Sequence, residues 1–263
     1  MSEADAFADV LGCPLCHGPL TPAEDGTLTC SACGARYPVM DGLADLVPPE
    51  PGQAETTNVR VMESGLFARV YERGWRPVLT RLLTGMSHDA ERAWSLDRLA
   101  PAPDATVLDL ACGPGNTTRT IADAVPAGRV LGIDFSTAML REALAAARVA
   151  GTTVAYVRGD AHFLPLQPGS VDAANCAGAF YLFCDPPRVL AGIATALRPG
   201  GHFTLMASQQ PRLGGAATAA LMRPSGLRVY ARGEMERLLD DAGFDVLDRR
   251  PAGFMLLLAA RRR

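Results

Sequence analysis

Two closely spaced cysteine pairs near the start of the chain constrain its fold most strongly. The stretches "CPLCHGPL" and "CSACG" place Cys-X-X-Cys pairs at residues 13–16 and 30–33. Zinc prefers four thiolates in a tetrahedron, and a two-residue spacer lets a tight turn aim two sulfurs at one ion. Between the pairs, an Asp-Gly turn signal at residues 25–26 precedes an alternating pattern that predicts a short hairpin.

These features predict a zinc ribbon with one structural Zn²⁺ per chain, held by Cys13, Cys16, Cys30 and Cys33. His17 is a further ligand candidate, although four cysteines already fill the coordination shell. The alternative is a redox-active dithiol. The remaining cysteines lie in apolar stretches and are expected to be reduced thiols of the core: Cys112, Cys176 and Cys184.

The composition predicts a folded, cytoplasmic protein. Of the 263 residues, 48% are hydrophobic and 20% are charged, which suits one core with an appendage. No apolar run reaches the length of a membrane span, and the acidic start "MSEADAFADV" lacks the basic, then apolar pattern of a secretion signal. The net charge of −3 disfavours unassisted binding to nucleic acid, which requires a basic face.

The pattern along the chain divides it into three segments. Residues 1–50 are the predicted zinc ribbon, and the polar, proline-rich stretch 47–58 reads as a linker that separates it from the rest. Residues 51–100 comprise this linker and a helical bridge, in which apolar side chains recur at helical spacing. The bridge is either a helical pair packed on the main domain or a lid over a ligand site. Residues 101–263 form the main domain.

The main domain alternates strand and helix patterns, beginning with the apolar run "ATVLDLA" at 105–111. Further strands are predicted at 129–134, 153–160, 171–178 and 201–208, with helices between them. Ser136 and Asp185 are predicted to cap two of these helices, and Gly151 to end the first. The alternation predicts a doubly wound α/β domain whose ligand lies at the carboxyl ends of the strands.

The first strand–helix turn predicts a nucleoside ligand. Gly113 and Gly115 allow a close approach of the backbone, and Asp134 at the end of the second strand is placed to accept hydrogen bonds from ribose hydroxyls. The third glycine of the dinucleotide fingerprint is replaced by Thr118. Since that glycine serves helix packing around a pyrophosphate, its absence disfavours NAD.

The stretches "VLDLACGPGN", "GIDFSTAML", "GDAHFLPLQPGSVDAA" and "LRPGG" stand in the order typical of class I S-adenosylmethionine methyltransferases, which residues 104–260 resemble. The resemblance implies a Rossmann-like seven-stranded sheet, here with an N-terminal zinc ribbon and a helical bridge. Together with the ribbon and "YERGWR", the whole chain resembles a ribbon-bearing branch that acts on small molecules.

The resemblance also implies which residues bind S-adenosylmethionine. Residues of the first turn would lie along the methionine moiety, Asp134 on the ribose, and the stretch after the third strand near the adenine. Asn175 belongs to the segment that would line the floor. The implied set is Asp109, Ala111, Gly113, Gly115, Asp134, Phe135, Met139, Asp160, Ala161, His162 and Asn175.

Methyl transfer from a sulfonium mainly requires that the nucleophile be held close to and in line with the methyl group. A general base is needed only if the acceptor keeps its proton at neutral pH. Many relatives carry a histidine after the fourth strand, whereas this chain reads "AGAFYLFCD" there. Tyr181 therefore takes the position of a catalytic residue, either as a hydrogen-bond donor or as part of the pocket wall.

We predict methyl transfer to a small, largely apolar biosynthetic acceptor, free or bound to a carrier. The alternative is a ribosomal RNA guanine N-methyltransferase that uses the ribbon to grip RNA. Arg36, however, is the only Lys or Arg among the first 50 residues, which disfavours that interpretation. A non-methylating cofactor-binding protein and a cyclase are further alternatives.

Overall fold

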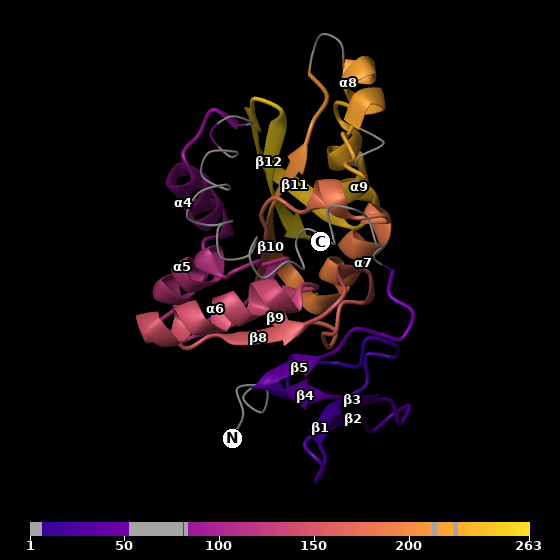
Figure 1. The fold of residues 1–263 in the computed structure, drawn as a ribbon. Helices are drawn as coiled ribbons and strands as arrows, with labels where there is room; N and C mark the ends of the chain where they lie inside the picture. The colour runs from indigo at the N-terminus through magenta and orange to yellow at the C-terminus, as the bar shows by residue number, and fades with distance from the viewer. Residues whose placement is uncertain (1–6, 53–80, 82–83, 212–214, 223–225) are drawn as a thin grey trace.

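The computed structural model describes residues 7–52, 81, 84–211, 215–222 and 226–263 (Figure 1). Its centre is a mixed sheet with the strand order β11-β12-β10-β9-β6-β7-β8-β5-β4. Seven of these strands form the predicted doubly wound sheet, which confirms the α/β fold: β6 (Thr106–Leu110), β7 (Arg129–Asp134), β8 (Ala155–Arg158), β9 (Val171–Cys176), β10 (Leu197–Ser208), β11 (Phe244–Ala252) and β12 (Met255–Arg262). Strands β6 to β10 run parallel, and β12 runs antiparallel to β10 and β11.

Helices cover both faces of the sheet (Figure 1). One face carries α4 (His88–Leu99), α5 (Asn116–Ala124) and α6 (Thr137–Ala150), and the other carries α7 (Pro186–Ala196) and α9 (Glu234–Asp241). Short elements follow β8, β9 and β10: η3 (Ala161–Phe163), η4 (Phe180–Leu182) and α8 (Gly215–Met222). The strand order reverses at β6, whose neighbours are β7 and β9. In open α/β sheets such a switch point marks the ligand site at the carboxyl ends of the strands.

The predicted helix caps are present. The side chain of Ser136 accepts a hydrogen bond from the Met139 N–H at the start of α6, and Gly151 ends that helix with a left-handed φ of 66°. Asp185 caps α7 by accepting from the Arg188 N–H. These local signals fix where the helices begin and therefore which loops face the carboxyl ends of the strands.

The N-terminal segment folds into a ribbon. Its three-stranded sheet comprises β1 (Leu20–Pro22), β2 (Leu28–Cys30) and β3 (Arg36–Tyr37). A second hairpin, β4 (Val39–Met40) and β5 (Leu43–Asp45), turns at Asp41 and Gly42, which both adopt left-handed φ angles, 56° and 83°. Two left-handed residues are what a tight hairpin turn requires.

This ribbon is an integral part of the molecule. Strand β5 pairs in parallel with β8, so the seven-stranded sheet gains two strands at this edge. The buried side chains of Leu11, Leu28 and Leu46 share one hydrophobic cluster with Ile133 and Leu166 of the main domain. The expectation that a linker holds the ribbon apart is therefore wrong for residues 47–52, although the boundaries of the three segments stay a prediction.

The predicted helical bridge is described only in its second half. Helix α4 begins after Ser87, whose side chain accepts a hydrogen bond from the Ala90 N–H, and it packs on β9, β10 and β12. Residues 53–80 and 82–83, where most of the proposed lid falls, lie outside the described residues. No helix in the described part of the chain is long and apolar enough to cross a membrane.

Candidate cofactor site and metal centre

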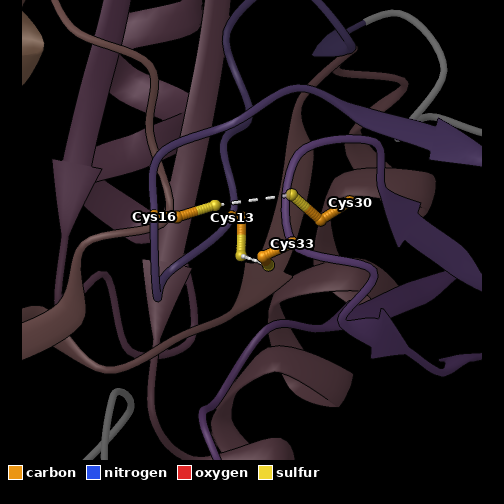
Figure 2. Close-up of side chains that lie close together, drawn as sticks. All are labelled: Cys13, Cys16, Cys30 and Cys33. Atoms are coloured by element: carbon orange, nitrogen blue, oxygen red, sulfur yellow. Dashed lines mark hydrogen bonds between the residues drawn. The ribbon is translucent and has the colours of Figure 1, made fainter.

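Four cysteine side chains converge between the ribbon's two tight turns (Figure 2). The Sγ atoms of Cys13, Cys16, Cys30 and Cys33 all lie within 4.8 Å of one another. The Sγ–Sγ distance is 3.5 Å for Cys16–Cys30 and 3.7 Å for Cys13–Cys33. Four thiolates around zinc at a Zn–S distance of about 2.3 Å would lie about 3.8 Å apart. The arrangement therefore fits a tetrahedral Zn²⁺ with no ligand position left open.

The surroundings of the four sulfurs also suit a metal. The Tyr37 hydroxyl lies 3.1 Å from the Cys13 sulfur, and burial together with this hydrogen bond raises the pKa of Tyr37, so that it stays a proton donor. Burial alone would raise the pKa of Cys30, but the backbone N–H groups of Cys33 and Ala32 and the neighbouring thiols lower it to about 7. This favours the thiolate that a metal requires at Cys30. At Cys16 the backbone N–H of Gly18 would lower the pKa, but the hydrogen bonds shared with the thiols of Cys30 and Cys33 raise it to about 12.

His17 is not needed as a ligand. Its Nδ1 atom lies 3.1 Å from the carbonyl oxygen of Leu166, which belongs to the main domain. The other expected core thiols differ among themselves: Cys112 and Cys176 are buried, whereas Cys184 is exposed, so the prediction for Cys184 is wrong. Cys184 lies in the short loop between η4 and α7.

The turn after β6 has the backbone geometry of a ligand cradle. Ala111, Gly113 and Gly115 all adopt left-handed φ angles, of 54°, 55° and 79°. Nothing lies within 4 Å of the place that a Cβ on Gly113 would take, so its backbone is accessible, whereas a Cβ on Gly115 would lie 2.3 Å from the Tyr156 hydroxyl. A non-glycine residue held in this conformation, as Ala111 is, is uncommon and occurs most often at functional sites.

Asp134 ties this turn to the end of β7. Its Oδ2 accepts a 2.8 Å hydrogen bond from the Gly113 N–H, and its Oδ1 accepts one of the same length from the Ser136 N–H. The residue is half-buried, so part of its carboxylate faces the carboxyl end of the sheet. The geometry therefore fits the predicted ribose contact. Phe135 beside it is half-buried under the guanidinium of Arg158, and Met139 is buried.

Asp109 has a supporting position beneath the turn. It is 2% exposed; its Oδ2 accepts a 2.6 Å hydrogen bond from the Thr118 hydroxyl and its Oδ1 one of 2.7 Å from the Asn175 amide. The Asn175 oxygen in turn accepts from the Thr204 hydroxyl at 3.0 Å. This buried chain of side chains joins β6, α5, β9 and β10. The predicted contacts of Asp109 and Asn175 with the cofactor stay a prediction.

The stretch after β8 is held by the ribbon's connection. Both oxygens of the buried Asp160 are engaged: Oδ1 accepts from the backbone and Nδ1 of His162 at 2.9 and 2.7 Å, and Oδ2 accepts from the Gly52 N–H at 2.7 Å. His162 is 4% exposed, and its Nε2 accepts from the Asp185 N–H at 3.3 Å. The predicted adenine contacts of Asp160, Ala161 and His162 stay a prediction, and Gly52 was missed because its partner lies far away in sequence.

Tyr181 lies in η4, directly after β9. It is half-buried and packs against an apolar cluster that includes Trp94, Met206 and Met255. The sequence leaves His88 as one of the remaining histidines, where a lone histidine is usually structural, and it gives no indication of Glu91. Both residues lie on α4, where Glu91 is buried on the same side as Trp94, Ser95 and Leu99.

Comparisons with known proteins identify both parts of the chain. Residues 107–201 match the family described as Methyltransferase domain, and residues 5–42 match the family described as Trm112p-like protein. The match to the second family covers all four clustered cysteines, and the match to the first covers the turn after β6, Asp134 and Asp160.

Among curated relatives, an uncharacterized 37.1 kDa protein of a Streptomyces fradiae transposon is 37% identical over 53% of this chain and 41% of its own length. A demethylmenaquinone methyltransferase of Deinococcus radiodurans is 31% identical over 63% of this chain and 67% of its own length. A ubiquinone biosynthesis O-methyltransferase of Cupriavidus pinatubonensis is 27% identical over 80% of this chain and 88% of its own length. The chain spans only 41–60% of the length of several of its relatives.

Solved structures share the fold. The [4+2]-cyclase SpnF gives a TM-score of 0.61 at 20% identity, over 67% of this chain and 81% of its own. A geranyl diphosphate C-methyltransferase from Streptomyces coelicolor, solved with S-adenosyl-L-homocysteine, gives a TM-score of 0.60 at 18% identity. The match covers 67% of this chain and 80% of that one. A complex between the Haloferax volcanii Trm112 methyltransferase activator and a methyltransferase gives a TM-score of 0.59 at 21% identity. The match covers 79% of this chain and 98% of the matched chain.

Proposed function

Because the chain belongs to the class I S-adenosylmethionine-dependent methyltransferases, we propose that it transfers a methyl group from S-adenosylmethionine to a small, largely apolar acceptor. The cofactor supplies an electrophilic methyl group on a sulfonium with a good leaving group. The protein's own contribution is to bind both molecules at the carboxyl ends of β6, β7 and β9, in line and without water between them. Two relatives that act in quinone biosynthesis support an acceptor of this chemical class.

One observation carries the proposal: the hydrogen bond between Gly113 and Asp134 joins the turn after β6 to the end of β7 at the switch point of the sheet. Backbone groups of residues 111–115 would hold the methionine moiety, and the Asp134 carboxylate would accept from the ribose hydroxyls. Phe135 and Met139 would contact the nucleoside, and the stretch from Asp160 to His162 would border the adenine. Asp109 and Asn175 would hold the cradle from below.

An apolar cluster supports the nature of the acceptor. Trp94, Met206 and Met255 are buried on the α4 face, and Tyr181 packs against them at the carboxyl end of β9. Large apolar and sulfur-containing side chains are suited to an apolar ring or chain and exclude water from the transferred methyl group. Tyr181, at the edge of this cluster, would contact the acceptor as part of its pocket wall or donate a hydrogen bond to it.

We further propose that the ribbon acts within this chain as an attached, zinc-containing support. Its resemblance to Trm112-like proteins and the pairing of β5 with β8 are consistent with this role. A ribosomal RNA acceptor is the second candidate, since the ribbon could grip RNA. Arg36 of the ribbon, however, forms an ion pair with Asp25, which leaves little positive charge for phosphates.

Methyl-labelled S-adenosylmethionine tests the function directly. The full chain is incubated with a solvent extract of apolar metabolites or with ribosomal RNA, and the label is then counted in each. We expect label in the extract and none in the RNA. Label in RNA alone would favour the second candidate, and cofactor binding without transfer to either acceptor would favour a cyclase or a binding protein.

A further inference from the structure

Helix α4 carries a buried histidine–carboxylate pair that the functions described above do not use. The Nδ1 atom of His88 lies 3.5 Å from Oε2 of Glu91, one turn later, and the side chains are only 10% and 1% exposed. Among the described residues, neither ring nitrogen of His88 and neither oxygen of Glu91 has a hydrogen-bond partner. Burying a carboxylate and an imidazole without hydrogen bonds is costly, so such a pair calls for a reason other than stability.

The pair lies at the end of the sheet where the acceptor must enter. At the far end of α4, the carbonyl of Leu99 lies 3.2 Å from Nδ1 of His202, near the start of the regular part of β10. The helix therefore runs back along β10, and its first turn lies about 16 Å away from Leu99, towards the carboxyl end of that strand. In agreement, Met86 and Trp94, on either side of the pair, pack with Met206 near the end of β10.

In the part of the chain that the structure describes, an apolar cluster packs on this helix around Trp94. Its members from other elements include Met206 from β10, Met255 from β12 and Tyr181 from η4. Tyr181 is the titratable group among these three. The charged neighbours on α4 itself, Asp89 and Arg92, pair with each other. An imidazole in such a site exchanges its proton with whatever polar group of a ligand reaches it.

We propose that His88 is the general base for the acceptor and that Glu91 is its positioning residue, an inference that rests on the proposed function. The acceptor carries an ionisable O–H group next to an apolar body. Nε2 of His88 takes the hydroxyl proton while the oxygen lone pair forms the bond to the methyl carbon. The carbon–sulfur bond breaks, and its electron pair remains on the sulfur of S-adenosylhomocysteine. Glu91 stabilises the resulting imidazolium through Nδ1, and the proton then passes to solvent.

This assignment explains why a carboxylate occupies the buried stripe of α4. A structural role would be satisfied by an apolar residue at position 91, since Trp94 and Leu99 already hold the helix to the sheet. A base needs an imidazole with one nitrogen facing a negative charge and the other left for the substrate. His88 has this arrangement: Nδ1 faces Glu91, and Nε2 has no hydrogen-bond partner in the described part of the chain.

The first arm of the test uses histidine-labelled protein saturated with S-adenosylhomocysteine. The chain has only four histidines, so the imidazole ¹⁵N signals can be assigned by substitution. We expect the tautomer with the proton on Nδ1, which faces Glu91, and with Nε2 unprotonated, and we expect Glu91→Gln to weaken this preference. A His88 that carries its proton on Nε2, or a tautomer preference unchanged by Glu91→Gln, would overturn the proposal.

The second arm measures methyl transfer to naphthohydroquinone, an apolar diol probe. His88→Gln should lower turnover by about 10²–10⁴-fold, and Glu91→Gln should move the rising limb of the pH–rate profile to lower pH. Asp89→Asn, an exposed neighbour on the same turn, is the control and should leave both unchanged. Equal turnover in His88→Gln and wild type would overturn the proposal; if the probe is not methylated, the NMR arm decides it alone.

Calorimetry with S-adenosylhomocysteine separates this inference from the proposed function. Wild type, His88→Gln and Glu91→Gln should bind it equally, because the pair serves the acceptor and not the cofactor. If the wild type fails to bind it, the proposed function fails; if binding is intact and His88 carries its proton on Nε2, only the present inference fails.

Discussion

The Gly113 N–H donates a 2.8 Å hydrogen bond to Oδ2 of Asp134, which joins the first turn of the domain to the end of its second strand. One carboxylate thereby orders the loop that would hold the methionine moiety and lies where we propose the ribose binds. The same atom pair explains why glycine and aspartate occur together in this motif: the backbone must be accessible, and its amide needs an anchor.

Asp134→Asn should weaken binding of S-adenosylmethionine by about 1.5–3 kcal/mol, because it removes a charged acceptor from both the Gly113 amide and the ribose. Calorimetry measures the affinity, and far-ultraviolet circular dichroism checks the fold. Asp104→Asn, at the exposed opposite edge of the sheet, is the control and should bind normally. Equal affinity in the two variants would remove Asp134 from the site.

Thr118→Val should destabilise the protein by about 1.5–3 kcal/mol, since it leaves the buried Asp109 without its 2.6 Å hydrogen bond. The matched control is Thr120→Val on the same helix, whose hydroxyl donates a 3.1 Å hydrogen bond to the carbonyl of Asn116. Urea unfolding gives the free energies. A loss no greater for Thr118→Val than for Thr120→Val would mean that the buried chain of side chains does not stabilise the fold.

Cys13→Ser should abolish the binding of one Zn²⁺ per chain and lower the free energy of unfolding of the whole protein by at least about 3 kcal/mol. The effect reaches the main domain because Cys13, Leu11 and Leu28 share its hydrophobic cluster. Cys184→Ser, an exposed cysteine outside the metal centre, is the control. Metal analysis and thermal unfolding decide the matter, and a metal-free variant that melts at the wild-type temperature would contradict the account.

An ion pair between Asp9 and Arg129, whose strength depends on pH, joins the N-terminal segment to β7. Both Asp9 oxygens accept from Arg129 at 2.8 Å, and this hydrogen bond holds the pKa of Asp9 below its usual 3.8. The stability it contributes is therefore present above about pH 4 and lost as the pH falls through the lowered pKa.

Asp9→Asn should accordingly cost about 0.5–1 kcal/mol at pH 7, and the difference from wild type should vanish near pH 2. Urea titrations across this range measure it, with Glu24→Gln on the exposed ribbon surface as the control. A difference that is the same at pH 7 and pH 2 would show that the charge plays no part.

Local signals predicted the fold where local chemistry determines it. The cap at Ser136, the stop at Gly151 and the strand at 129–134 all lie where the sequence indicates, because each depends on neighbouring residues. The convergence of the cysteines followed from their spacing alone. By contrast, β10 begins at Leu197, earlier than the predicted 201, because an irregular register through "RPGG" still reaches β9.

Long-range pairings could not be predicted from the sequence. The pairing of β5 with β8 and the hydrogen bond between Gly52 and Asp160 depend on where the ribbon docks. Likewise, the polar composition of residues 47–52 indicates a linker, yet tertiary contacts hold this stretch in place. The His88–Glu91 pair became visible only when α4 was seen to run along β10, since one buried carboxylate on a polar helix has no distinctive pattern.

The most direct test of the central claim is a calorimetric titration of the wild-type chain with S-adenosylhomocysteine and, separately, with NAD. The account predicts one site per chain for S-adenosylhomocysteine, weakened in Asp134→Asn, and no measurable binding of NAD. Tight binding of NAD with no response to S-adenosylhomocysteine would contradict it.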